Sequence, residues 1–225
     1  MKLLRTMTIW LLIMIAGFLV STPGVYADNI NLGDLITFSR GPGSGPGGEF
    51  IVTDTTTGYQ FSSFCVETNE YISFGSQFSV GGISSQAING GSGGGHPDPL
   101  DYRTAYLYYH FVKRDLSNYN YGSNASADAL QKAIWYVEQE LGNTDWSNPA
   151  AYLGTGTQAL AWFNEASAAN WTDYNGVAIL NVLNSAGAVA QDQLVLVPEP
   201  STLLLLGFGL LGLGILGRKK FKAKA

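Results

Sequence analysis

The sequence predicts an α+β protein, a β-rich barrel or sandwich scaffold with an inserted helical subdomain. Three observations support this fold class. Up to residue 92, short apolar or β-branched runs alternate with Gly, Ser, Asn and Asp. From residue 102, apolar residues recur at helical spacing, and two further apolar runs lie near the end of the domain. Strands, then helices, then strands again are typical of the α+β class.

Short strands separated by turns are predicted in the first half. A strand is indicated where apolar, aromatic or β-branched residues are bounded by turn-forming residues. The runs that meet this description are residues 35–38, 50–52, 59–61, 64–66 and 78–80. Gly and Pro are too frequent in residues 41–48 and 90–99 for a helix or a central strand, so both segments are predicted loops.

Three helices are predicted in the second half. Residues 102–112 are rich in aromatic and apolar side chains at helical spacing. Residues 126–141 form the second helix, capped by Ser126 and stopped by the Gly and Asn that follow it. The third covers residues 157–168. Its inward-facing side chains are predicted to be Leu160, Ala161 and Phe163.

Two closing strands are predicted after the helices. Residues 193–197 are apolar enough to form the last strand of the domain. Residues 177–182 are predicted as its neighbour, although residues 177–183 also suit a helix.

The N-terminus has the features of an export signal. Lys2 and Arg5 precede an apolar run over residues 9–20, and residues 25–27 supply the small side chains that a signal peptidase needs. We therefore predict that residues 1–27 are a signal peptide. The exported domain then covers residues 28–197, which is long enough for one domain with a sizeable core.

The C-terminus combines three unlike elements in a fixed order. Pro198, Glu199 and Pro200 are followed by the uncharged apolar residues 202–217 and then by a basic cluster over residues 218–224. This order resembles the PEP-CTERM sorting signal of Gram-negative bacteria, which an exosortase reads. The resemblance implies that residues 198–225 anchor the protein transiently in the inner membrane through a transmembrane helix and are then removed. The apolar run is close to the lower limit of about 17 residues for a spanning helix, so an uncleaved anchor is the alternative.

The predicted domain is acidic. Residues 28–197 hold five basic and 16 acidic residues, a net charge of −11. Such a field repels nucleic acid and anionic lipid surfaces, so neither is expected as a partner. A negative surface also favours solubility.

Cys65 is the only cysteine of the chain. Exported proteins usually pair their cysteines in disulfides, and one cysteine cannot form an intramolecular disulfide. Three interpretations stay open: Cys65 is a small buried apolar residue, pairs between chains, or takes part in chemistry.

Two short segments bear on this choice. In the first, Phe64-Cys65-Val66-Glu67, an aromatic residue precedes the cysteine. In the second, Leu130-Gln131-Lys132-Ala133-Ile134-Trp135, a glutamine opens a Gln-x-Ala-Ile-Trp helix. Together they resemble the signature segments of the thioester domains of surface adhesins. The resemblance spans residues 64–137 and places an aromatic-rich helix at residues 102–112. The family usually has Thr at the position of Leu130 and is best known from Gram-positive surfaces.

The resemblance implies an internal thioester between Cys65 and Gln131, with Phe64, Ala133, Ile134 and Trp135 as motif neighbours. An acyl group on sulfur is far more electrophilic than an amide. The protein is then expected to capture an amine- or hydroxyl-bearing surface protein or polysaccharide covalently. Each molecule would react once, so it is not expected to be an enzyme, and no cofactor is expected.

A non-covalent alternative stays open, in which the protein is a structural or carbohydrate-binding component of an extracellular polysaccharide or biofilm matrix. It is suggested by the export signals, the acidic surface and the aromatic residues Trp146, Trp162 and Trp171, which are expected to be exposed. This interpretation predicts a free Cys65 thiol and no effect of changing Gln131.

Other site types find little support in the sequence. The two histidines, His96 and His110, are far apart, and no ligand cluster at zinc spacing accompanies them. The sequence has no Gly-x-Ser-x-Gly elbow, and its Gly-rich runs lack the Lys-Ser/Thr of a phosphate-binding loop. Glu67, Tyr71, His110 and Glu138 could assist proton transfer, but no motif assigns them a role.

Overall fold

Six strands form one antiparallel sheet in the computed structural model, which describes residues 30–90, 95–142 and 145–197. Their order is β3-β2-β1-β4-β7-β8. The strands are β1 Leu35–Arg40, β2 Phe50–Asp54, β3 Gln60–Ser63, β4 Gln77–Ser84, β7 Val177–Asn184 and β8 Val189–Leu196. A separate two-stranded ribbon pairs β5 Gln86–Ala87 with β6 Asp98–Pro99. The α+β class is therefore confirmed.

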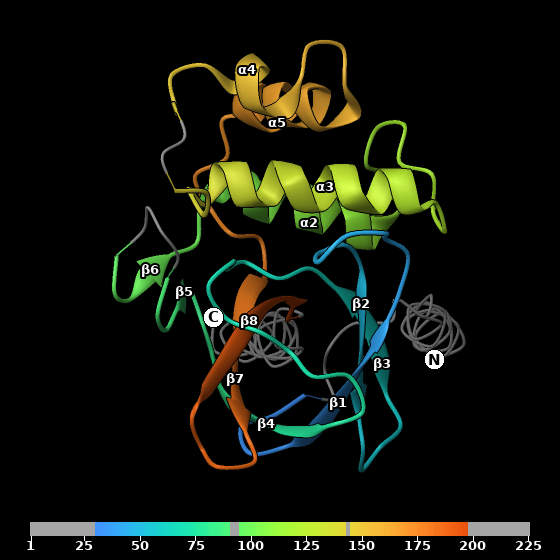
Figure 1. Cartoon of the computed structure of the whole chain (residues 1–225), viewed down its shortest axis with the longest axis vertical. Helices are drawn as coiled ribbons and strands as arrows, with labels where there is room; N and C mark the ends of the chain where they lie inside the picture. Colours follow the sequence, from blue (N-terminus) through green and yellow to red (C-terminus); the bar gives the residue numbers. More distant parts are fainter. Residues whose placement is uncertain (1–29, 91–94, 143–144, 198–225) are drawn as a thin grey trace, which may run out of the picture.

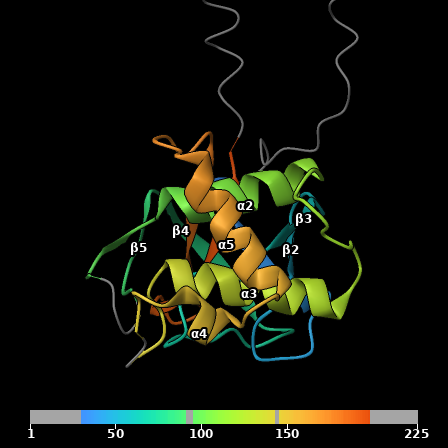
Figure 2. The same ribbon diagram turned by 90° about the horizontal axis from the view of Figure 1, so that it is seen from above.

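The helices form a layer on one end of the sheet and are inserted between β6 and β7 (Figure 1). They are α2 Tyr102–Lys113, α3 Asn124–Val137, α4 Pro149–Leu153 and α5 Gln158–Ala169. Seen from above, α5 crosses over α2 and α3 (Figure 2). Among the described residues, no helix combines the length and the apolar character needed to span a membrane.

The sheet is open and sandwich-like, and it does not close into a barrel. β1 pairs with both β2 and β4, and β4 pairs with β7 across a bulge between Val80 and Gly82. The edge strands are β3 and β8. Just past the end of β3, Cys65 forms an isolated antiparallel bridge with Gln193 of β8. The sheet therefore curls, and its two edges approach each other at this single bridge next to the helical layer.

Two apolar cores fill the part of the molecule that the structure describes. One lies among the helices and the side of the sheet that faces them, and it includes Phe64, Phe111 and the fully buried Trp162. The other lies inside the curled sheet and includes Phe38, Val52 and Cys65. Successive residues of an extended chain point to opposite faces. For this reason Phe64 and Cys65, adjacent in sequence, enter different cores.

Helix boundaries differ in part from the prediction. Residue 102 begins α2 as predicted, after Asp101, whose side chain accepts a hydrogen bond from the Arg103 backbone N–H at 2.7 Å. The predicted cap of α3, Ser126, is wrong, because Ser123 caps the helix and Ser126 is buried one turn inside it. The predicted end at residue 141 is also wrong.

The early end of α3 has a local cause. The chain reverses at Gln139, which adopts a φ of 60°, and the Glu140 backbone N–H donates to the Trp135 carbonyl at 2.9 Å. The reversal carries Glu140 to Thr68, whose hydroxyl donates to its carbonyl at 2.6 Å. A residue other than Gly or Asn rarely adopts this conformation, so the sequence pattern did not mark this end.

Four further predictions need correction. Residues 64–66 do not form a strand and make a single bridge at Cys65. Asp98 and Pro99, predicted as loop, form β6. In α5 the buried residues are Ala159, Trp162 and Ala166; the predicted Leu160 and Phe163 are partly buried and pack against the core, whereas Ala161 is exposed. Trp162, expected to be exposed, is only 1% exposed, while Trp146 and Trp171 are partly buried.

Candidate functional site

Cys65 occupies a special position in the strand pairing. The Leu194 backbone N–H donates to the Phe64 carbonyl at 3.0 Å, and the Val66 N–H donates to the Asp192 carbonyl at 3.2 Å. Cys65 and Gln193 between them therefore form a non-hydrogen-bonded pair. In such a pair the backbone N–H and carbonyl of each residue point away from the partner strand. The backbone polar groups of Cys65 are thus available to a group on the other side.

The side-chain carboxamide of Gln131, a residue of α3, binds these two backbone groups of Cys65. The Cys65 backbone N–H donates to Gln131 Oε1 at 3.3 Å, and Gln131 Nε2 donates to the Cys65 carbonyl oxygen at 2.8 Å. Cys65 Sγ lies 3.3 Å from the same Oε1. The structure therefore brings together the two residues that the motifs singled out, 66 positions apart in the chain.

Both residues are shielded from solvent, with Cys65 0% and Gln131 1% exposed. Burial raises the pKa of the Cys65 thiol, and the negative charges of Glu67 and Glu140 raise it further. The Trp135 side chain lowers the pKa. Its indole Nε1 lies near the sulfur, although it makes no hydrogen bond of normal length and angle to any described residue. Burial dominates, so Cys65 is a neutral thiol at neutral pH.

The other residues of the two motifs pack around the contact between Cys65 and Gln131. The Phe64 ring packs edge-on against Phe111 of α2, with centroids 5.0 Å apart. Ala133 and Ile134 are fully buried in the helical core on α3. The aromatic helix α2 thus lies against the segment that carries Cys65 and against the helix that carries Gln131. The aromatic and apolar positions of the two motifs act mainly by packing.

The geometry suits an acyl transfer between the two side chains. The Cys65 sulfur and the Gln131 carboxamide are in contact and shielded from solvent, and the Cys65 backbone N–H donates to the carboxamide oxygen. Such a donor stabilises the negative charge that develops on oxygen when a nucleophile adds to a carbonyl. Fixed proximity of the two groups also replaces the entropy cost of bringing them together.

Glu67, His110 and Glu138 each have hydrogen-bond partners of their own, and Tyr71 is exposed. Glu67 is buried, and its carboxylate accepts from the backbone N–H groups of Gly90 at 3.2 Å and Asp192 at 2.9 Å. Tyr71 is 80% exposed, and His110 bonds Asp115 at 2.8 Å. Glu138 accepts from the Asp101 backbone N–H at 3.2 Å. Within the described ranges, no cluster of three or more His, Cys, Asp or Glu side chains could hold a metal ion.

Sequence reasoning did not find two further parts of the site. Gly47 lies directly over the pair, because a Cβ added to it would lie 2.5 Å from Gln131 Cγ. Gln193 is fully buried opposite Cys65, and its Oε1 makes no hydrogen bond within the described part of the chain. No motif signals either residue, because both act through contacts between distant segments.

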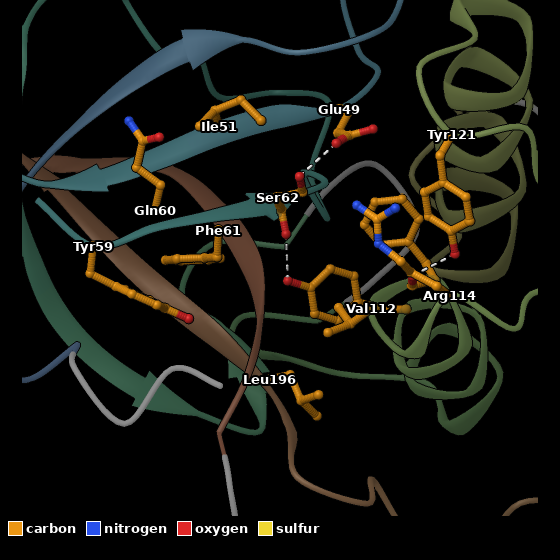
Figure 3. Close-up of a pocket in the computed structure, with 12 residues that line it drawn as sticks. Glu49, Ile51, Tyr59, Gln60, Phe61, Ser62, Val112, Arg114, Tyr121 and Leu196 are labelled. Atoms are coloured by element: carbon orange, nitrogen blue, oxygen red, sulfur yellow. Dashed lines mark hydrogen bonds between the residues drawn. The ribbon is translucent and has the colours of Figure 1, made fainter. Parts of the chain in front are cut away.

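A separate cavity opens between the β3 edge of the sheet and the end of α2 (Figure 3). Its volume is about 310 Å³. Glu49 accepts a hydrogen bond from the Ser62 hydroxyl at 2.6 Å, and the Arg114 guanidinium lies over the Tyr121 ring at 4.8 Å. Burial raises the pKa of Glu49. Aromatic rings and one group of each charge therefore line the same hollow.

Comparison with known proteins identifies the C-terminal segment. The family model of the PEP-CTERM protein-sorting motif matches residues 196–220. The chain therefore carries the sorting motif of exosortase-processed proteins, and it is exported to the cell surface or the extracellular space. The predicted signal peptide, Pro198, Glu199, Pro200 and the predicted transmembrane segment lie outside the described residues. Searches of the curated proteins and of the solved structures find no significant match.

Proposed function

We propose that this exported protein captures a partner covalently through an internal thioester between Cys65 and Gln131. The observation that carries the proposal is the contact of the two side chains, with Cys65 Sγ 3.3 Å from Gln131 Oε1 in a site closed to solvent. The two hydrogen bonds between the Cys65 backbone and the Gln131 carboxamide also support the proposal, because they fix the group that must be attacked.

Formation of the thioester bond needs no external reagent. The Cys65 sulfur adds to the carboxamide carbon of Gln131, the carbon–nitrogen bond breaks, and the thiol proton leaves with the nitrogen as ammonia. An acyl–sulfur bond replaces an acyl–nitrogen bond, and nothing is oxidised or reduced. The Cys65 backbone N–H faces the oxygen on which charge develops.

In the capture step the partner supplies the nucleophile and the Cys65 sulfur is the leaving group. An amine or hydroxyl of the partner attacks the same carbonyl carbon, the carbon–sulfur bond breaks, and the proton passes to sulfur. The partner is then joined to residue 131 by an amide or ester bond, and Cys65 is a free thiol. Each molecule reacts once, so we propose a binding protein rather than an enzyme. Burial protects the bond from hydrolysis until a partner arrives.

Intact mass measurement tests this proposal. The full chain, purified in detergent without reducing agent, is compared with its Cys65→Ser variant, so that processing at either end cancels. We expect the wild-type chain to be lighter by one ammonia, after correction for the substitution, and to gain one methylamine at Gln131 with release of the Cys65 thiol. Equal masses and a free thiol from the start would reject the thioester.

A second candidate function rests on the cavity beside β3. We propose that it binds a neutral saccharide non-covalently, because aromatic rings, Phe61 and Tyr121 among them, line it, and Glu49 and Arg114 supply an acceptor and donors. Its volume of about 310 Å³ lies at the lower end of the range of small-molecule sites.

Saturation-transfer NMR on the full chain tests this second function. Glucose, galactose and N-acetylglucosamine are the probes, and Tyr121→Ala is compared with Tyr109→Ala, a ring on the same helical layer that does not line the cavity. Transfer to a sugar that is lost only in Tyr121→Ala would support the site. Absence of transfer to all three sugars, or equal transfer in both variants, would reject it.

A further inference from the structure

Neither reactive residue of the proposed thioester site is accessible in this structure. Cys65 is 0% and Gln131 1% exposed, so no amine or hydroxyl of a macromolecular partner can reach the carbonyl carbon without a movement. The segment that covers the pair identifies the part that has to move.

Residues 41–48 form that cover. Gly47 and Gly48 are buried, and a Cβ on Gly47 would lie 2.5 Å from Gln131 Cγ and 2.6 Å from Cη2 of Trp135. Only a glycine allows the backbone to approach this closely. The segment therefore lies directly on the glutamine side chain and on the indole beside the cysteine.

The outer half of the segment is fastened to α3 by polar contacts. The Gly43 backbone N–H donates to Asn124 Oδ1 at 2.9 Å, and the Ser44 N–H donates to Asp128 Oδ1 at 2.9 Å. The Ser44 hydroxyl also bonds the Asp128 carboxylate. Asn124 and Asp128 lie one turn apart on α3, so both contacts share one face of that helix.

The base of the segment is closed like a hairpin. The Gly41 backbone N–H donates to the Glu49 carbonyl at 2.9 Å, and the Glu49 N–H donates to the Pro42 carbonyl at 2.8 Å. The residues between are Gly, Pro and Ser only. No large apolar side chain anchors them, and the contacts with Asn124 and Asp128 are solvent-exposed. Arg40 Nη1 also donates to the Gly45 carbonyl at 3.1 Å, again in solvent. Segments attached by exposed hydrogen bonds open more easily than a packed core.

We infer that residues 41–48 are a gate over the Cys65–Gln131 site, held shut by Ser44 and Gly43 on Asp128 and Asn124 of α3. The inference rests on the proposed thioester and adds how access to it is controlled. Opening moves Gly47 off the glutamine while the hairpin base at Gly41 and Glu49 stays closed. A partner that competes for the Asp128 carboxylate or the Asn124 amide opens the gate as it docks.

The rate of methylamine incorporation into the full chain tests the gate. Asp128→Ala removes the main contact of Ser44, and Asp145→Ala is the matched control, since it removes an exposed carboxylate that bonds Ser147 away from the gate. We expect Asp128→Ala to react about 5- to 10-fold faster than wild type, as the loss of about 1 kcal/mol of closing free energy predicts. Asp145→Ala should react at the wild-type rate.

A second measurement tests the opening of residues 41–48 independently of whether the thioester forms. Hydrogen exchange at the amides of Gly43 and Ser44 reports opening whatever the state of Cys65. If no ammonia is lost, Cys65 is a free thiol, and its alkylation by iodoacetamide replaces methylamine as the probe of access. Faster exchange in Asp128→Ala with an unchanged rate of methylamine incorporation or alkylation would overturn the gate. Failure of the proposed function alone would appear as a missing mass loss with accelerated alkylation.

Discussion

The backbone of Cys65 holds the side chain of Gln131 as it would hold a neighbouring strand. Its N–H donates to Oε1 at 3.3 Å and its carbonyl accepts from Nε2 at 2.8 Å. The carboxamide thus makes the two hydrogen bonds that a peptide group of a neighbouring strand would make, at the point where the edge of the sheet contacts α3. This satisfies two buried backbone groups and fixes the carboxamide beside Sγ through the same contacts.

The first prediction concerns the two hydrogen bonds between the backbone of residue 65 and the side chain of Gln131. In the Cys65→Ser background, where no thioester can form, Gln131→Leu should lower the free energy of unfolding by about 3 kcal/mol, because both backbone groups of residue 65 lose their partner in the core. Gln131→Glu should cost less than Gln131→Leu only at acid pH, where a protonated carboxyl can accept from the N–H and donate to the carbonyl of residue 65; an ionised carboxylate would face that carbonyl unpaired. Urea denaturation followed by circular dichroism measures both. A cost below about 0.5 kcal/mol for Gln131→Leu would contradict the prediction.

The second prediction concerns close packing under residues 41–48. Gly47→Ala places a methyl group 2.5 Å from Gln131 Cγ, and overpacking of this kind costs about 1–3 kcal/mol. Gly45→Ala is the control, because a Cβ there meets nothing within 4 Å. Thermal denaturation should show a lower Tm for Gly47→Ala and an unchanged Tm for Gly45→Ala. Equal Tm values would mean that residues 41–48 do not pack closely against Gln131.

The third prediction concerns pH. Burial, and next the charge of Asp192, raise the pKa of Glu67, and burial raises the pKa of Asp192 to about 6. The folded protein therefore binds more protons than the unfolded chain at pH values above about 4, where free carboxyls ionise. Stability must then fall as pH rises from 5 to 9. The Tm should decrease over this range, and Glu67→Gln should flatten the decrease. A Tm that rises with pH would contradict it.

The fourth prediction concerns the start of α3. The Ser123 side chain accepts from the Ser126 backbone N–H at 3.4 Å, so Ser123→Ala should destabilise the protein by about 1 kcal/mol, the usual cost of losing an N-cap. Ser117→Ala is the control, because Trp162 Nε1 bonds the Ser117 backbone carbonyl rather than its side chain. Urea denaturation of both variants measures the difference. Equal unfolding free energies would show that Ser123 does not cap the helix.

Sequence patterns predicted most of the elements because each carries a local signal. The apolar run at residues 50–52 and the aromatic spacing in residues 102–112 mark β2 and α2 without reference to the rest of the chain. The choice of cap for α3 failed because Ser123 and Ser126 offer the same chemistry, and only tertiary packing buries one of them. The reversal at Gln139 is imposed by the contact of Glu140 with Thr68.

The candidate site was predicted only as a pair of motifs. Short motifs marked Cys65 and Gln131, but their spacing of 66 residues says nothing about distance in space. Gly47, Asp128 and Gln193 escaped notice because a glycine in a Gly-rich loop, an acid on a helix and a glutamine on a strand have no distinguishing pattern. Their roles appear only when β3, α3, β8 and residues 41–48 meet.

The pairing of residue 65 with the last strand also sets an order of events. Phe64 and Val66 are fixed by Leu194 and Asp192, which lie close to the C-terminal end of the folded domain. For a domain that crosses the membrane N-terminus first, Cys65 and Gln131 pass before the strand that orients Cys65. The proposed thioester site is then complete only when residues 192–194 have paired with residues 64–66.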